Sequence, residues 1–131
     1  GKGDIKREGS DVTVIATGKM VYEALAAAEK LDKDDISVEV LDPRTLYPLD
    51  KELIERSIAK THKAVIVTEE NRRGGYGGEL SAIIAEEMFD YLDGPVVRIG
   101  ALDSPVPFAP VLEQLYIPNS KDIVKAVREM A

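Results

Sequence analysis

Short apolar runs alternate along this chain with stripes of apolar residues at helical spacing. The runs at 11–17, 36–41, 64–68 and 96–99 are mainly apolar and rich in β-branched residues, which is typical of strands buried on both faces. Apolar positions three and four apart predict a helix after each strand. The clearest stripe consists of Leu80, Ile83, Ile84, Met88, Tyr91 and Leu92. Strands that alternate with helices through short connections predict a parallel, doubly wound α/β sheet, which we expect residues 1–131 to form as one domain.

Local signals mark several boundaries of these elements. Asp50 has the character of an N-cap for the helix that follows it, and Asn119 or Ser120 is expected to cap the last helix. Prolines at 43 and 48 predict a loop between the second strand and its helix. Residues 5–7 are expected to add a short edge strand, whose direction the pattern leaves open.

The stretch at 64–80 holds the strongest candidate for a functional loop. A buried strand leads into the carboxylates Glu69 and Glu70 and then into a glycine-rich loop before a helix. That loop consists of Gly74, Gly75, Tyr76, Gly77 and Gly78. Backbone amides at a helix start attract anions, whereas small residues let a helix pack closely on its strand or on another chain. The spacing matches neither the dinucleotide-binding fingerprint nor a P-loop, so the packing interpretation is favoured and anion binding stays open.

The titratable residues do not form a catalytic pattern. Adjacent carboxylates at a strand end point in different directions, so hydrogen bonding or pairing with Arg72 or Arg73 is favoured over acid–base catalysis by Glu69 and Glu70. His62 is the single histidine and is expected to be an exposed turn residue. With no cysteine and one histidine, a transition-metal site is not indicated.

Glu69, Glu70 and the glycine-rich loop are candidates for contacts with other subunits, and three further residues are candidates as well. Arg44 follows the second strand and would either pair locally with Asp42 or reach a neighbouring subunit bidentately. Phe108 and Tyr116 lie in a proline-rich segment that would either form a stable interface or cover the domain's own sheet edge.

Composition and charge limit the kinds of partner and cellular compartment that we expect for this chain. The net charge of −7 argues against nucleic acid, whose phosphates would be repelled, and an acidic surface would suit a basic partner protein or simply maintain solubility. No apolar run is long enough to cross a membrane. The lack of cysteines fits a reducing compartment, so we expect the cytoplasm. The chain begins without methionine, and we expect it to be a piece of a longer polypeptide.

Several motifs, in order, resemble the C-terminal domain of the transketolase family. They are VTVIATG at 12–18, LDPRTLYPLD at 41–50, VTEE at 67–70 with the glycine loop, SPVPFAP at 104–110 and YIP at 116–118. The last two favour the β subunit of the thiamine-diphosphate-dependent, decarboxylating component of 2-oxo acid dehydrogenase complexes. Pro43 and the charged pair before the glycines depart from the pattern and leave the subtype open.

The resemblance implies a three-layer α/β/α domain with a mostly parallel five-stranded sheet and one antiparallel edge strand, which would be residues 5–7. It implies that the parent enzyme oxidatively decarboxylates a 2-oxo acid with thiamine diphosphate and Mg held by other domains. The C-terminal domain would then assemble the α subunit and a second β subunit and dock the dihydrolipoyl acyltransferase core, whose subunit-binding module is basic in related complexes. The alternatives are a transketolase or deoxyxylulose-phosphate synthase domain, or an independent anion-binding regulatory module.

Overall fold

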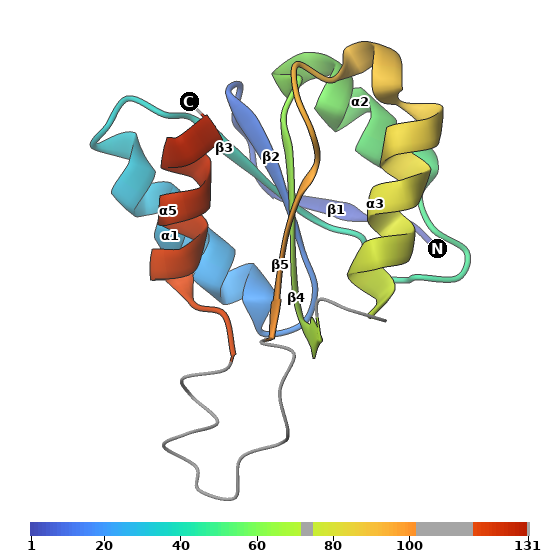
Figure 1. Ribbon diagram of the computed structural model, residues 1–131, viewed down its shortest axis with the longest axis horizontal. Coiled ribbons are helices and arrows are strands. Elements are labelled where there is room, and N and C mark those ends of the chain that lie inside the picture. The colour runs from blue at the N-terminus through green and yellow to red at the C-terminus, as the bar shows by residue number, and fades with distance from the viewer. Residues whose placement is uncertain (72–74, 102–116, 131) are drawn as a thin grey trace, which may run out of the picture.

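The computed structural model describes residues 1–71, 75–101 and 117–130, and these residues fold around one five-stranded sheet (Figure 1). The strands are β1 (Asp4–Arg7), β2 (Val12–Ala16), β3 (Val38–Asp42), β4 (Ala64–Asn71) and β5 (Val97–Ala101). The helices are α1 (Met20–Asp32), α2 (Lys51–Thr61), α3 (Tyr76–Glu87) and α5 (Ser120–Met130), with a short 3-10 helix η1 (Phe89–Tyr91). The four strands expected from the apolar runs are therefore confirmed.

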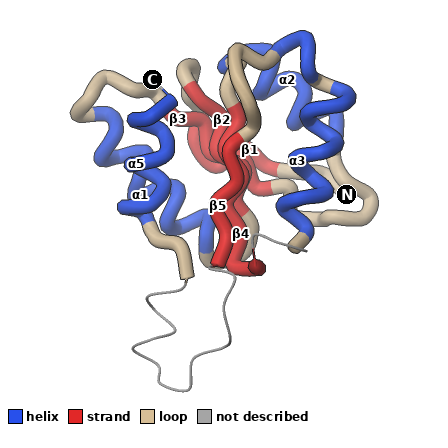
Figure 2. The backbone as a smooth tube through the Cα atoms, in the orientation of Figure 1, coloured by secondary structure: helices blue, strands red, loops and turns tan. Residues whose placement is uncertain are grey.

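The strand order is β1-β3-β2-β4-β5. Strands β3, β2, β4 and β5 pair in parallel, and β1 pairs antiparallel with β3 at the edge of the sheet. The antiparallel edge strand implied by the resemblance is thus present. Figure 2 shows the sheet between two helical layers, with α1 and α5 on one face and α2 and α3 on the other.

The alternation of side chains across the sheet divides the core in two. Val14 of β2 belongs to the cluster beneath α1 and α5, and its neighbour Ile15 belongs to the cluster beneath α2 and α3. Both side chains are 0% exposed, as expected for a strand with helices on both faces. In β2 every residue is buried, so an uninterrupted apolar run was the correct signal for this strand.

Side-chain caps fix the starts of two helices. Asp50 accepts a hydrogen bond from the backbone N–H of Leu53 at 3.2 Å, which confirms it as the N-cap of α2. Asn119 accepts from the backbone N–H groups of Lys121 and Asp122, and the Asp122 carboxylate accepts from the Asn119 N–H at 2.9 Å. This reciprocal arrangement is a capping box, so Asn119 is the cap of α5.

Two expected boundaries were wrong. Helix α3 ends at Glu87, and Tyr91 lies in η1 with 37% of its surface exposed, so it is not part of the buried stripe. Strand β4 continues to Asn71, and its pairing with β5 is irregular between Val67 and Asn71. Val67 pairs with Ile99 and Asn71 with Ala101, so three residues of β4 lie opposite one residue of β5, which is a bulge of the kind that redirects side chains. Glu69 therefore lies inside the strand rather than after it.

A buried polar network lies between the sheet and α2. It consists of Thr13, Glu39, Ser57, Lys60 and Thr61. The Glu39 carboxylate is 2% exposed; it accepts from the Ser57 hydroxyl at 2.6 Å and also binds the Lys60 ammonium. It further accepts the backbone N–H of Gly9 at 3.1 Å, which ties the loop after β1 to the sheet.

Candidate functional site

The carboxyl ends of the parallel strands bring the predicted residues to one edge of the sheet. The loop 43–50 follows β3, the turn at Gly18 follows β2, and the bulge of β4 leads toward α3. Open α/β sheets form their contact surfaces at this edge. The structure therefore places Arg44, the glutamates of β4 and the start of α3 in one region, as the sequence predicted.

The turn after β3 is ordered by a carboxylate bound to the backbone. Asp42 Oδ1 accepts the backbone N–H of Arg44 at 2.8 Å, and Arg44 has a φ of +60°, in the left-handed region. Asp42 thus stabilises the loop through the main chain of Arg44, whose side chain is left for other contacts. The pKa of the Asp4 carboxyl lies below its ordinary value, chiefly because Lys6 bonds to it and also because of the positive charge of Arg44.

Two tyrosines and a glutamate form an aromatic cluster beside this turn. The rings of Tyr47 and Tyr76 pack edge to face with centroids 5.9 Å apart. The Tyr47 hydroxyl donates to both carboxylate oxygens of Glu79, at 3.1 and 3.2 Å, and this bond raises the pKa of Tyr47. The Tyr76 hydroxyl donates to the Leu46 carbonyl at 3.2 Å. Tyr47 is fixed by these contacts yet 73% exposed, so it presents a rigid aromatic face to solvent.

The N-terminus of α3 already has an anion from its own chain. Glu70 Oε2 accepts the backbone N–H of Tyr76 at 3.2 Å, in the first turn of the helix. Glu69 lies on the other side, with Oε1 4.0 Å from the point where a Cβ would project from Gly18. The two glutamates therefore diverge, as expected for neighbours in a strand, and do not converge on one substrate atom.

The glycines after Gly75 are helical and not part of a loop, because α3 begins at Tyr76. Gly77 is buried, and a Cβ placed on it would lie 3.5 Å from Thr68 Cγ2 and 3.6 Å from Ile66 Cγ2. A Cβ on Gly78 would approach the Arg98 guanidinium at 3.0 Å. A side chain at Gly77 would thus make only ordinary contacts with β4, and the tight approach is that of Gly78 to Arg98 of β5, so the requirement for small residues stays a prediction.

Some of the predicted contact residues cannot be placed. Gly74, Phe108 and Tyr116 lie outside the described residues, as do Arg72 and Arg73. A role of the predicted residues in contacts between subunits stays a prediction.

The described part of the chain holds no convergent set of catalytic or metal-binding groups. It contains no cluster of three or more His, Asp or Glu side chains that could bind a metal ion. His62 is exposed, as predicted; it ends α2 with a φ of +64°, and its Nδ1 bonds to the Tyr91 carbonyl at 2.8 Å. None of the described helices is long and apolar enough to span a membrane.

Sequence reasoning missed three strongly exposed aromatic residues, Tyr22, Tyr47 and Phe89. Phe89 is 70% exposed and comes directly after Met88, which is buried. Its position off the apolar stripe of α3 was an available signal, since a large apolar residue outside the buried face must be exposed or bound. Tyr47, between Leu46 and Pro48, carried no such signal.

Comparison with known proteins identifies the family. The model of the family described as "Transketolase, C-terminal domain" matches residues 1–123. The chain belongs to this family.

Relatives of this transketolase C-terminal domain include three β subunits of bacterial enzymes. It is 48% identical over 99% of its length to the acetoin:2,6-dichlorophenolindophenol oxidoreductase β subunit of Bacillus subtilis. It is 46% identical over 100% of its length to the 2-oxoisovalerate dehydrogenase β subunit of the same organism. It is 42% identical over 98% of its length to the pyruvate dehydrogenase E1 component β subunit of Staphylococcus epidermidis. The chain spans only 38%, 40% and 39% of those relatives.

A solved structure agrees with the fold. The domain superposes on a split-gene transketolase, described as an inactive β4 tetramer, with a TM-score of 0.83 and 34% identity. The match covers 98% of this chain and 40% of that chain. The three-layer, mostly parallel architecture inferred from the resemblance is therefore confirmed.

Proposed function

We propose that this chain is the C-terminal assembly domain of the β subunit of a thiamine-diphosphate-dependent 2-oxo acid dehydrogenase. The observation that supports it most is the identity of 46% and 42%, over nearly the whole chain, to the β subunits of a 2-oxoisovalerate dehydrogenase and a pyruvate dehydrogenase. In this proposal the parent enzyme, a longer polypeptide acting in the cytoplasm, oxidatively decarboxylates a 2-oxo acid and transfers the acyl group to lipoyl. This domain holds the β subunit to an α subunit and to a second β subunit.

The chemistry of the described residues does not fit the cofactor. Thiamine diphosphate with Mg requires hydrogen-bond donors to bind the diphosphate and a cluster of oxygen ligands to bind the metal. The helix N-terminus of α3 is engaged by Glu70, and the described side chains form no metal-binding cluster. The proposal therefore assigns the cofactor and the bond-making steps to other parts of the parent enzyme.

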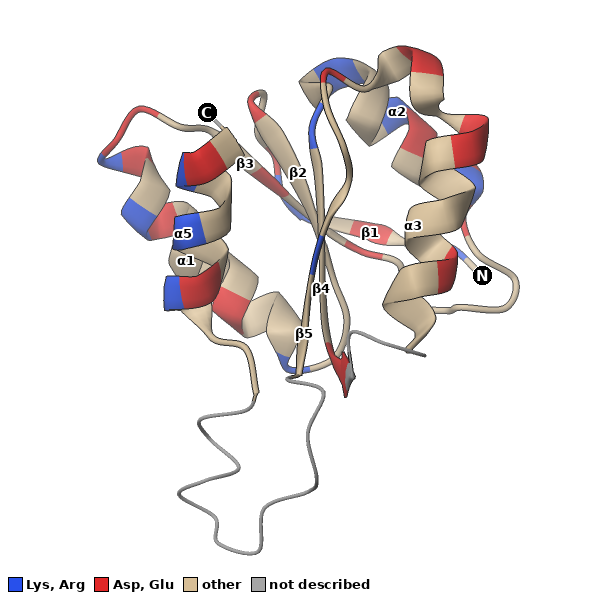
Figure 3. Cartoon of the chain, in the orientation of Figure 1, with Lys and Arg blue, Asp and Glu red and all other residues tan. Residues whose placement is uncertain are grey.

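The charge of one helical layer supports docking of a basic partner, which we assign to the subunit-binding module of the acyltransferase core. Residues 85–97 contain four carboxylates and no lysine or arginine, and Figure 3 shows acidic residues along α3 and the segment after it. Glu86 and Glu87 lie in the last turn of α3, where negative charge is unfavourable for the helix dipole. Glu87 is paired with the Lys51 ammonium of α2 at 3.1 Å. Helix stability thus gives no reason for Glu86. A basic partner gives one.

Phe89 supplies the apolar contact of this docking surface. Its side chain is 70% exposed and flanked by Glu87, Asp90 and Asp93. An exposed aromatic residue surrounded by charge is typical of an interface anchor, because aromatic side chains carry much of the energy of protein association. The surface lies on the α2–α3 side of the sheet.

Calorimetry of the chain with the subunit-binding module of a dihydrolipoyl acyltransferase tests the docking. Phe89→Ala is expected to weaken binding by about tenfold or more, since an anchor residue contributes over about 1 kcal/mol. Tyr22→Ala is the matched control, because Tyr22 is an equally exposed aromatic residue (74%) on α1, in the opposite layer. No heat and no complex on gel filtration would contradict the docking, and equal losses in the two variants would contradict this location.

The likeness to the split-gene transketolase keeps a transketolase-type parent as a second candidate. The polypeptide that contains this domain distinguishes the two. A diphosphate-binding Gly-Asp-Gly motif on the same polypeptide would indicate a transketolase or synthase, whereas copurification with a separate α subunit would indicate the dehydrogenase. Turnover of a 2-oxo acid by the 131-residue chain alone would overturn the assembly role.

A further inference from the structure

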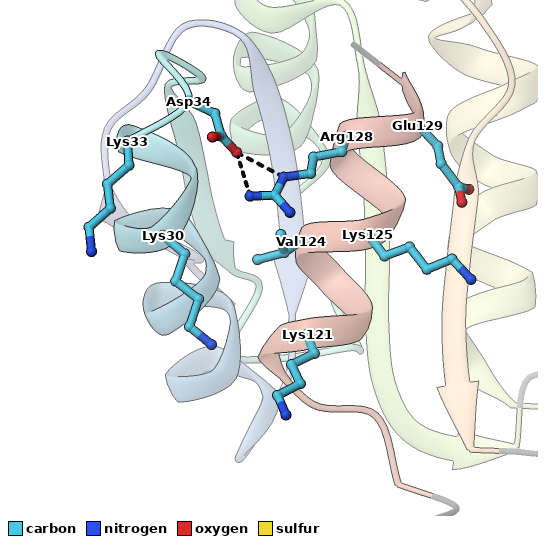
Figure 4. Close-up of a pocket in the computed structure, with 8 residues that line it drawn as sticks. All are labelled: Lys30, Lys33, Asp34, Lys121, Val124, Lys125, Arg128 and Glu129. Carbon is cyan, nitrogen blue, oxygen red and sulfur yellow. Dashed lines mark hydrogen bonds and ion pairs between the residues drawn. The ribbon is translucent and has the colours of Figure 1, made fainter.

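A basic groove lies between α1 and α5, on the face of the sheet opposite the proposed docking surface. The groove has a volume of about 670 Å³ and is shown in Figure 4. It is lined by Lys30, Lys33, Asp34, Lys121, Val124, Lys125, Arg128 and Glu129. Five cationic side chains therefore face two carboxylates, in a chain whose overall charge is −7.

Most of this positive charge is not neutralised within the described part of the chain. Lys33, Lys121 and Lys125 form no ion pair with any described carboxylate, and Lys30 donates to the neutral hydroxyl of Ser120 at 3.1 Å. Lys121 and Lys125 are one helical turn apart, and like charges at that spacing destabilise a helix. Lys121 also lies in the first turn of α5, where the helix dipole disfavours a cation. Asp122 and Glu129, three and four positions from Lys125, offset part of this repulsion, and an anion in the groove would offset more.

The groove already binds one carboxylate. Arg128 donates to Asp34 Oδ2 from Nε at 2.8 Å and from Nη2 at 2.7 Å, across the gap between the two helices. Figure 4 shows this contact above Val124, whose side chain forms an apolar part of the wall. A carboxylate bound by a guanidinium is thus an interaction that this surface makes with the chain's own residue.

We propose that the groove binds an acidic segment of a partner polypeptide. The layout of the lysines favours an extended anion: in Figure 4, Lys30 and Lys121 extend toward one end of the groove, whereas Lys33 and Lys125 point away from it on opposite sides, so the ammonium groups do not converge on one point. A compact phosphate needs donors that converge on one point, whereas carboxylates spaced along a peptide meet charges spaced along a groove.

Fluorescence anisotropy with a labelled decaglutamate peptide tests the proposal on the 131-residue chain. At low salt, where screening is weak, we expect saturable binding that weakens by about tenfold or more in the double variant Lys121→Glu/Lys125→Glu. The matched control is Lys2→Glu/Lys63→Glu, which makes the same change in net charge away from the groove and should bind within about twofold of the parent chain. Circular dichroism of each variant establishes that the fold is retained.

The remaining outcomes overturn the proposal. Absence of peptide binding at low salt excludes an acidic segment as the occupant. Equal weakening in the control variant shows that net charge alone attracts the peptide. Displacement of the peptide by inorganic phosphate at an ionic strength where chloride has no effect identifies a small-anion site instead.

Discussion

Lysine 60 and glutamate 39 offer the sharpest test of how this fold tolerates a buried charge. The Glu39 side chain is 2% exposed and the Lys60 side chain 47% exposed, so the two partners differ in their access to water. Without Lys60, the carboxylate stays buried with only its bonds to Ser57 and Gly9. Without Glu39, the ammonium can turn outward into solvent. The two single substitutions are therefore not equivalent.

The magnitudes follow from this asymmetry. Lys60→Met should lower the free energy of unfolding by about 3 kcal/mol, at the low end for breaking a buried pair because the site is open to water on the lysine side. Glu39→Met should lower the free energy of unfolding by about 2 kcal/mol, mainly because the backbone N–H of Gly9 loses its acceptor. The Ser57 hydroxyl keeps Thr13 as a hydrogen-bond partner at 2.7 Å. The double variant should cost no more than Glu39→Met alone. The coupling energy between the two sites is then about 3 kcal/mol.

Urea unfolding of the four proteins at neutral pH measures this cycle. Shifts in the midpoint with an unchanged m-value would show that stability, and not the compactness of the unfolded state, has changed. A coupling energy below about 0.5 kcal/mol would refute the reasoning, because it would mean that the buried carboxylate does not depend on the ammonium.

Three further substitutions test packing and capping. Gly9→Ala should destabilise the fold by at least about 2 kcal/mol, because its Cβ would lie 2.2 Å from the Val38 carbonyl carbon. Gly77→Ala, whose nearest contact would be 3.5 Å away, should stay within about 0.5 kcal/mol of the parent chain; similar losses in urea midpoints would contradict this contrast. Asp50→Ala should cost about 1 kcal/mol at neutral pH. The N–H groups of Gly3 and Leu53 lower the pKa of Asp50, so its contribution is present above the ordinary carboxyl pKa and lost as pH falls through the lowered value. If Asp50→Ala lowered the free energy of unfolding as much in acid as at neutral pH, that role would be contradicted.

The sequence predicted what depends on local pattern. The apolar runs located the buried strands because α1 and α5 cover one face of β2 and α2 and α3 cover the other, so no alternation was expected. The caps Asp50 and Asn119 were recognisable because capping uses a side chain within three residues of the amides it binds. Arg44 and Glu70 were placed at the correct edge because parallel strands end together.

What the sequence could not predict depends on pairing between distant segments. The bulge in β4 is defined only by its register with β5, some thirty positions away. The burial of Glu39 required partners from Gly9, Ser57 and Lys60, between 18 and 30 positions distant. Neither feature can be recognised from the sequence of its own strand. The sequence around Glu39, for example, does not indicate which residues bind its carboxylate.

Because Glu70 binds the backbone N–H of Tyr76, an external anion would have to compete with the chain's own carboxylate at the first turn of α3. Donor and acceptor are six positions apart, and such a short tether gives an effective concentration on the order of millimolar. A dissolved anion must displace a carboxylate that cannot diffuse away. Replacement of this single glutamate by a neutral residue is therefore the simplest route by which the fold could acquire a new affinity there.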